Sequence, residues 1–142
     1  MSYLWVTVGS ALGGLLRFAL GKLMLSFDVS IGFPIGTLLI NVIGSFVIGY
    51  FGTLTLHSGR YPVSDNVRLF VMVGICGGFT TFSSFSLQTF DLMRSGAWGR
   101  ALANIVLSVI LCVAAAAAGH LLAYRAVPAQ AIAETAREEY TG

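Results

Sequence analysis

Hydrophobic residues fill four long segments of the chain, and short stretches rich in charged residues, proline or glycine separate them. Apolar residues occur on every face of these segments, so length and breaks define them better than periodicity does. The segments run over residues 3–25, 33–56, 66–93 and 98–124, with loops at 26–32, 57–65 and 94–97. Because about 20 mostly apolar residues cross the hydrocarbon core as a helix, the pattern predicts an all-α integral membrane bundle of four transmembrane helices.

Composition excludes an ordinary soluble domain. Of the 142 residues, 56% are hydrophobic and only 10% are charged, whereas soluble domains carry about 25% charged residues. The first segment lacks a basic n-region and is too long for a signal peptide, so we expect it to stay as a span. We expect one transmembrane domain over residues 1–125 and a solvated tail over 126–142. Cys76 and Cys112 lie inside apolar segments and are expected to be small packing residues.

The basic residues give little preference for one orientation in the membrane. Four spans place both termini and the second loop on one side, with Arg60, Arg68, Arg125 and Arg137, and leave Lys22, Arg94 and Arg100 on the other. Orientation follows the Lys/Arg excess in short loops, so both orientations are expected to coexist.

Small residues at four-residue spacing recur in the segments, as Gly9/Gly13, Gly32/Gly36, Ser45/Gly49 and Gly74/Gly78. Such pairs let membrane helices approach closely, either within one subunit or between two. Four helices leave little room for an aqueous path between them, whereas two chains could line one. We therefore expect a dimer.

Polar residues within the spans are the main candidates for function. In the second span Thr37, Asn41 and Ser45 share one helix face, and in the fourth span Asn104, Ser108 and Cys112 do the same. The Asn41 amide can donate two hydrogen bonds, which suits an anion, but a single Asn is often a clamp between helices. A Ser in a membrane helix usually bonds back to the carbonyls of its own helix, so this role is favoured for the Ser108 hydroxyl considered alone.

The third span contains a polar and aromatic run from Gly77 to Phe85, preceded by Gly74. Glycine costs a helix about 1 kcal/mol relative to Ala, and Thr and Ser compete for backbone hydrogen bonds. We expect the helix to be broken there or kinked, and a broken helix in the membrane is a candidate ion site. Phe82 and Phe85 are three residues apart, and their positive ring edges could meet an anion if the rings do not simply pack.

Charged residues favour an anion as the cargo. Arg17 lies well inside the first span and Lys22 follows five residues later, while the one acidic residue inside a span is Asp91, near the end of the third. A positively biased path suits an anion. Arg17 could instead snorkel or bind carbonyls at a helix end.

Three runs of sequence stand out together: GICGGFTTFSSFS at 74–86, GTLLINVIGSF at 36–46 and, in support, GGLLRF at 13–18. In these runs the chain resembles the small fluoride channels of the CrcB/Fluc family. The resemblance covers the four spans. It implies an antiparallel, dual-topology homodimer with two pores that exports fluoride passively across the inner membrane of a bacterium.

The same resemblance implies roles for individual residues. Phe82 and Phe85 would lie beside the fluoride path and Asn41 would donate to the ion, with Ser83, Ser84 and Ser108 along the path and Arg17 and Lys22 as vestibule charges. The backbone carbonyls of Gly77 and Thr80 would bind one structural Na⁺ at the two-fold axis. The chain departs from the family at Gln88, where many members have Glu, and at Lys22, where Arg is common.

Two other classes of function are weighed against a fluoride channel. A proton-coupled exporter of cationic drugs can also use four spans, but it needs a titratable carboxylate deep in the membrane, and Asp91 is too near an end. A membrane assembly factor would leave vesicles tight to small ions. We expect no enzyme activity, because no Ser/His/Asp, Cys/His or metal-ligand constellation falls within one span.

Overall fold

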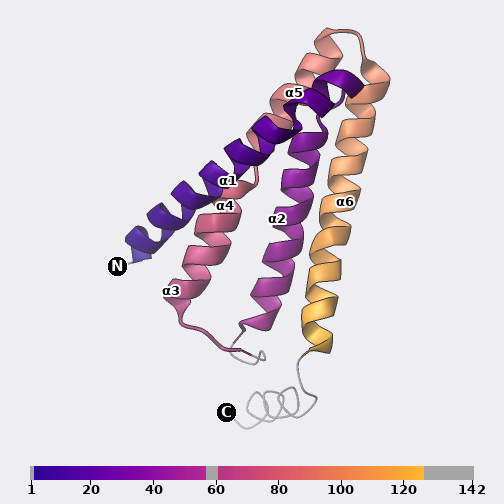
Figure 1. The fold of residues 1–142 in the computed structure, drawn as a ribbon. Coiled ribbons are helices and arrows are strands. Elements are labelled where there is room, and N and C mark those ends of the chain that lie inside the picture. Colours follow the sequence, from indigo (N-terminus) through magenta and orange to yellow (C-terminus); the bar gives the residue numbers. More distant parts are fainter. Residues whose placement is uncertain (1, 57–60, 127–142) are drawn as a thin grey trace.

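The computed structural model describes residues 2–56 and 61–126, which form helices joined by short turns (Figure 1). Four helical stretches are long and apolar enough to cross a membrane, as predicted. Three of them are α1 (Ser2–Ile31), α2 (Ile35–Leu54) and α6 (Trp98–Arg125). The third stretch, Asp65–Arg94, consists of α3 (Asp65–Arg68), the π-helix η1 (Leu69–Cys76), α4 (Gly77–Phe79) and α5 (Phe82–Arg94).

The first helix is longer than predicted. Residues 26–31, expected to be a loop, continue α1, and the chain reverses in the short connection to α2, where Gly32 has a φ of 65°. The Asp28 carboxylate oxygen Oδ1 accepts a hydrogen bond of 2.9 Å from the Gly36 amide. Asp28 therefore provides an acceptor for an amide at the start of α2 that has no partner within its own helix. The polar residue that suggested a loop in the sequence thus has a structural role at the end of α1.

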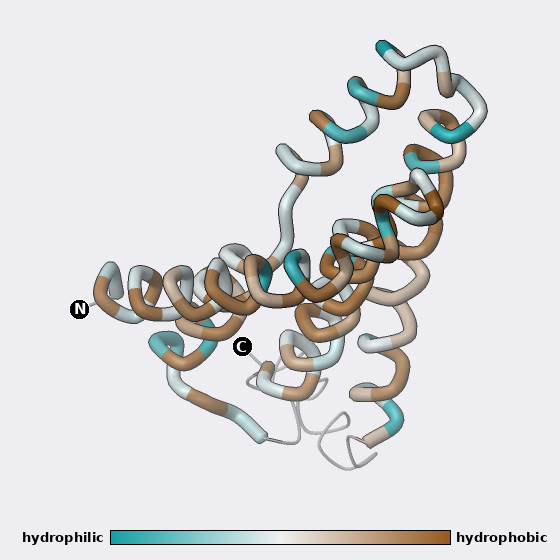
Figure 2. The backbone as a smooth tube through the Cα atoms, turned by 45° about the horizontal axis from the view of Figure 1, so that its top comes forward, coloured by the Kyte–Doolittle hydropathy of each residue, from teal (hydrophilic) through white to brown (hydrophobic). Residues whose placement is uncertain are grey.

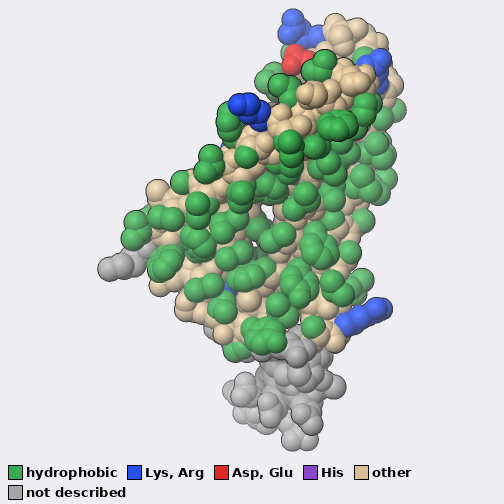
Figure 3. Space-filling model, viewed as in Figure 1, with side chains coloured by type: hydrophobic (Ala, Val, Ile, Leu, Met, Phe, Trp, Pro, Cys, Tyr) green, Lys and Arg blue, Asp and Glu red, His purple; other side chains and the backbone are tan. Residues whose placement is uncertain are grey.

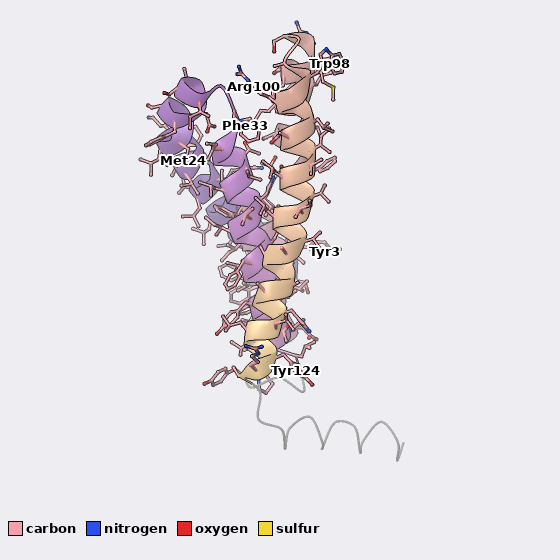
Figure 4. All side chains as sticks on the ribbon, turned by 90° about the vertical axis from the view of Figure 1, so that its right-hand side faces the viewer. Tyr3, Met24, Phe33, Trp98, Arg100 and Tyr124 are labelled. Atoms are coloured by element: carbon pink, nitrogen blue, oxygen red, sulfur yellow. The ribbon has the colours of Figure 1, made fainter. Side chains whose placement is uncertain are left out.

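The two loops at the same end of the bundle are connected. Arg100, near the start of α6, donates from Nη1 to the Gly32 carbonyl at 3.0 Å. Figure 4 shows Arg100 beside Phe33 at this end of the molecule. At the opposite end, Arg68 donates to the Gly52 carbonyl at 3.0 Å and to Thr55 Oγ1 at 2.8 Å, so it binds the last turn of α2. Arginine side chains thus hold the connection that precedes α2 and the last turn of α2 itself.

Glycines bring the helices together within the subunit. A Cβ on Gly49 would overlap the Ala116 carbonyl, and one on Gly119 would overlap the Phe46 carbonyl, so α2 and α6 lie in direct contact along their lengths (Figure 1). A Cβ on Gly13 would meet the backbone of Ile75. For these glycines the structure supports packing within the subunit as the role of the small residues.

The helical stretch Asp65–Arg94 is interrupted after its glycines rather than at them. Gly74 lies in η1 and Gly77 and Gly78 lie in α4, all with helical neighbours, and the backbone becomes extended at Thr80 and Thr81. The break expected within the polar run therefore lies at Thr80 and Thr81, and the glycines before it remain helical. The physical reason is that Gly74 and Gly78 contact the backbone of α1, and this close approach favours the helical form.

The outer surface matches a multi-pass membrane protein. Hydrophobic turns predominate along α1, α2 and α6, whereas α5 also carries hydrophilic residues along its length (Figure 2). Hydrophobic side chains cover the face seen in Figure 3, with Lys and Arg toward the two ends. Trp98 and Tyr124 lie at opposite ends of α6, 65% and 49% exposed (Figure 4). Aromatic residues are enriched at both membrane interfaces. Of the predicted tail, residues 127–142 lie outside the described residues, as do Arg60 and Arg137.

Candidate functional site

The interruption between α4 and α5 redirects backbone hydrogen bonds toward α2. Thr80 has φ −75° and ψ 157°, and Thr81 has φ −152° and ψ 112°. In a continuous α-helix the Thr81 amide would donate to the Gly77 carbonyl. Here it donates instead to Asn41 Oδ1 at 2.8 Å. The Gly77 carbonyl therefore loses the donor that a continuous helix would supply.

Asn41 binds the interruption in both directions. Its Nδ2 donates to the Thr81 carbonyl at 3.1 Å, while its Oδ1 accepts from the Thr81 amide. The side chain is therefore a clamp between α2 and the extended segment. An amide nitrogen carries two hydrogens, and only one of those on Asn41 is bonded within the described residues. The sequence left two roles open for Asn41, a clamp between helices and a hydrogen-bond donor to an anion. In this arrangement one side chain can fill both roles.

A hydroxyl cluster begins α5. Thr81 Oγ1 accepts a hydrogen bond of 3.1 Å from the Ser84 amide, which makes Thr81 the N-cap of this helix. The same oxygen lies 3.1 Å from Ser83 Oγ and 3.0 Å from Ser84 Oγ. Thr81 is 6% exposed and was not singled out from the sequence. Its preference for the N-cap position, directly before a helical run, is the signal that could have identified it.

The two predicted rings lie next to each other at the start of α5. The ring centroids of Phe82 and Phe85 are 5.4 Å apart, with the planes tilted by 45°. Phe82 is 78% exposed and Phe85 is half-buried. A large ring exposed beside an extended backbone segment leaves its edge free for a ligand or for a second chain.

A cavity of about 470 Å³ collects most of the predicted site residues. Its wall contains six of them, contributed by α2, by the α4–α5 region and by α6: Asn41, Gly77, Thr80, Phe82, Phe85 and Ser108. Ser83 and Ser84 do not line this cavity, although Ser84 bonds to Thr81, which does. The structure therefore brings together residues that are far apart in the sequence.

The two vestibule charges differ in position. Arg17 donates from Nη1 to the Thr80 carbonyl at 3.4 Å, so it contacts the interruption from α1. The carbonyl-binding role that the sequence left open for Arg17 is the one seen here. Lys22 is exposed and makes no hydrogen bond or ion pair within residues 2–56 and 61–126. Neither side chain lines the cavity.

A buried hydrogen-bond chain connects α6 to the ring-bearing turn of α5. Asn104, 2% exposed, donates from Nδ2 to Thr89 Oγ1 at 2.8 Å. Thr89 in turn donates to the Phe85 carbonyl at 2.7 Å. Thr89 was not recognised from the sequence. A Thr hydroxyl in a membrane helix can bond to a carbonyl of its own helix or to a side chain of another helix, and the sequence does not distinguish the two.

Gln88 faces a second cavity, of about 370 Å³, near one end of the bundle. Asp28 and Asp91 also line this cavity. Gln88 Oε1 is buried and has no hydrogen-bond partner within the described part of the chain. Gln88, one of the two positions at which the sequence was expected to depart from the family pattern, thus has a side-chain carbonyl without a donor among the described residues.

Comparisons with known proteins agree on one family. The sequence profile of the family described as "CrcB-like protein, Camphor Resistance (CrcB)" matches residues 4–120. A relative from Methylobacterium radiotolerans named "Fluoride-specific ion channel FluC" is 62% identical over 118 residues, which cover 83% of this chain and 81% of the relative. A protein of the same name from Gluconobacter oxydans is 58% identical over 136 residues, 94% of this chain and 93% of the relative.

Proposed function

The chain belongs to the CrcB family, and on that basis we propose that it is a fluoride-selective ion channel that exports fluoride passively and protects the cell from its toxicity. Relatives that share more than half of its residues over most of its length carry the name of a fluoride-specific ion channel. The membrane is the inner membrane of a bacterium. No energy source is needed, because the anion moves down its own electrochemical gradient.

The observation that best supports this function is the bonding of Asn41. The side chain holds the extended segment at Thr81 and keeps one amide hydrogen for a passing anion. Asn41 lies in the same cavity wall as both rings and Ser108. Fluoride is a hard, strongly hydrated anion, so donors that replace its water must be positioned in advance. Because the Asn41 side chain is already held by its bonds to Thr81, it loses no conformational freedom each time an anion passes.

The rings and hydroxyls provide weak contacts along the path. Ring edges at Phe82 and Phe85 carry partial positive charge and interact with an anion weakly. Conduction requires binding that is strong enough for entry and weak enough for release. Ser108 adds a hydroxyl from α6, while Ser83 and Ser84 extend the polar surface around Thr81. Arg17 and Lys22 bias the entrance toward anions.

A second, antiparallel copy completes the pathway in this proposal. The exposed Phe82 ring and the open cavity lie on the face that the partner would cover. Basic residues at the two ends are nearly balanced within the described residues, with Lys22, Arg94 and Arg100 at one end and Arg68 and Arg125 at the other. Insertion in both orientations follows from this balance.

The extended segment fits a structural Na⁺ at the two-fold axis of that dimer. The Gly77 carbonyl has lost its helical donor, and Thr80 offers a second carbonyl, which has two lone pairs and accepts one weak bond from Arg17. Two carbonyls from each of two chains make a set of hard oxygen ligands suited to a hard cation. The ion would hold the two interruptions together. It takes no part in moving fluoride.

Fluoride efflux from liposomes tests the function directly. Vesicles loaded with potassium fluoride and carrying few protein copies should release fluoride rapidly when valinomycin relieves the voltage, while vesicles loaded with chloride retain it. Equal release of both anions would contradict selectivity. Vesicles that retain fluoride but release protons on addition of a cationic drug would identify the coupled exporter instead. Loss of efflux when Na⁺ is replaced during reconstitution would support the central cation.

A further inference from the structure

Three sulfur side chains lie in the wall of the cavity that holds the candidate fluoride pathway. Met72 and Cys76 come from η1, and Cys112 comes from α6. Both cysteines are free thiols. Cys76 is 3% exposed, as expected of a packing residue, but Cys112 is only half-buried. Thiols and thioethers are soft ligands with no use for fluoride or Na⁺, which are both hard ions.

The positions of these residues place sulfur along the proposed path. Cys112 follows Ser108 by one helical turn on α6, and both line the cavity. Met72 turns toward α2, since a Cβ on Gly52 would meet its Cε at 3.0 Å and its Sδ at 3.7 Å. Cys76 lies four residues beyond Met72 in η1 and borders the same cavity. One wall from η1 and one from α6 therefore both carry sulfur.

We propose that this cavity binds a soft monovalent cation of the Ag⁺ or Cu⁺ class, and that the bound cation stops fluoride transport. Cys112 and Cys76 bind it as thiolates, and the Met72 thioether is a weaker third ligand. Each S–H bond that is replaced by a sulfur–metal bond releases one proton to water, so no oxidant or reductant is required. The effect on transport rests on the proposed function, whereas binding of the cation does not.

Transport stops because the cation would be fixed in the space that fluoride must cross. The cavity wall also contains Asn41, Phe82 and Ser108. Two thiolates around one monovalent cation carry a net negative charge, so the filled site repels an anion, and a metal ion bridging the two walls also narrows the space. Because fluoride would have to pass this charge, we expect efflux to fall about tenfold or more when the site is full.

The test uses silver nitrate on proteoliposomes in a chloride-free buffer, since chloride precipitates silver. Micromolar silver on both sides of the membrane should lower fluoride efflux from native protein, and an excess of dithiothreitol should restore it. Native mass spectrometry of the same protein in detergent should show one silver ion per chain. Undiminished efflux from protein that carries silver would overturn the block.

Variants locate the ligands, each compared with its own efflux in the absence of silver. The double variant Cys76→Ala/Cys112→Ser removes every thiol of the chain, which has two cysteines. It should bind no silver, and its fluoride efflux should not change when silver is added. Met72→Leu should need more silver for the same block, while Met93→Leu, outside the cavity, is the matched control. A block of equal size in the thiol-free variant would overturn the site. Native vesicles that release no fluoride even without silver would overturn the proposed function, and the mass measurement would still decide the metal site.

Discussion

The two halves of the third span contact the rest of the molecule in different ways. The first half, η1 and α4, lies against α1 through glycines whose missing side chains allow backbone to meet backbone, as at Gly78 and Ser10. The second half, α5, lies against α6 and is held by a side-chain hydrogen bond between Thr89 and Asn104. Thr80 and Thr81 separate the halves.

This difference shows how a membrane helix can be interrupted without becoming loose. The glycine half is positioned mainly by close backbone contact with α1, and the polar half is held to α6 by a side-chain hydrogen bond. The extended segment between them is tied to α2 by Asn41 and to α1 by Arg17. Backbone groups that leave a helix within a bilayer need such partners. Variants in each half should therefore fail in different ways, either in assembly or in transport.

The largest effect is expected from overfilling the glycine half. Gly13→Leu places a side chain against the Ile75 backbone, which cannot move aside. Overpacking of this kind costs about 3 kcal/mol or more, so little folded protein should be recovered by size-exclusion chromatography. Gly14→Leu is the matched control, because nothing lies within 4 Å of a Cβ at Gly14. Normal recovery of Gly13→Leu would contradict the close contact of α1 with η1.

The next largest effect is expected at the clamp. Asn41→Asp can still accept from the Thr81 amide, but it cannot donate to the Thr81 carbonyl, and its negative charge repels an anion. Fluoride efflux should fall to the background of empty liposomes. Asn41→Ala leaves both Thr81 groups without a partner and should lower stability by about 1–3 kcal/mol per buried group. Efflux from Asn41→Asp equal to native would remove Asn41 from the path.

Removal of one ring should reduce transport and leave assembly intact. Phe82→Ile or Phe85→Ile keeps apolar volume but loses the polarised ring edge, whose contacts are worth about 1 kcal/mol, so efflux should fall about fivefold. Phe90→Ile, on the same helix and 56% exposed, is the control and should transport normally. Undiminished efflux in both test variants, with normal chromatography, would show that the rings only pack.

A smaller effect is expected where α5 meets α6. Asn104→Ala removes the donor to Thr89, and Thr89→Val removes the acceptor and the bond to the Phe85 carbonyl. Each variant should lower thermal stability modestly. The coupling between them in a double-mutant cycle should be about 1 kcal/mol, the value of one hydrogen bond. Strictly additive losses would show that the contact contributes nothing.

The smallest effect is expected at Lys22. Its side chain is exposed and unpaired within the described residues, so Lys22→Gln removes only a long-range attraction for anions. Efflux should fall less than about twofold at low ionic strength, and the difference should vanish near 1 M salt, where the Debye length is about 3 Å. A salt-independent loss of tenfold or more would place Lys22 in direct contact with the ion.

The four helices could be predicted almost entirely from the sequence. Long apolar segments have one stable form in lipid, so length alone located α2 and α6 to within two residues of their ends. The prediction failed at residues 26–31, whose polarity suggested a loop. Polar residues near a helix end can serve a neighbouring helix, as Asp28 does for α2, and sequence alone does not distinguish this from a turn.

The sequence by itself determined which residues are available for an ion, because polar and charged side chains inside apolar spans are few and are costly unless they are used. Only the tertiary structure decided how they are arranged. It placed the interruption at Thr80 and Thr81, paired Thr81 with Asn41 across 40 positions of sequence, and left Ser83 outside the cavity wall. Contacts between helices depend on how each helix is rotated about its axis and how far it is shifted along it. The close approach of glycines sets both, and neither can be predicted from a local pattern of residues.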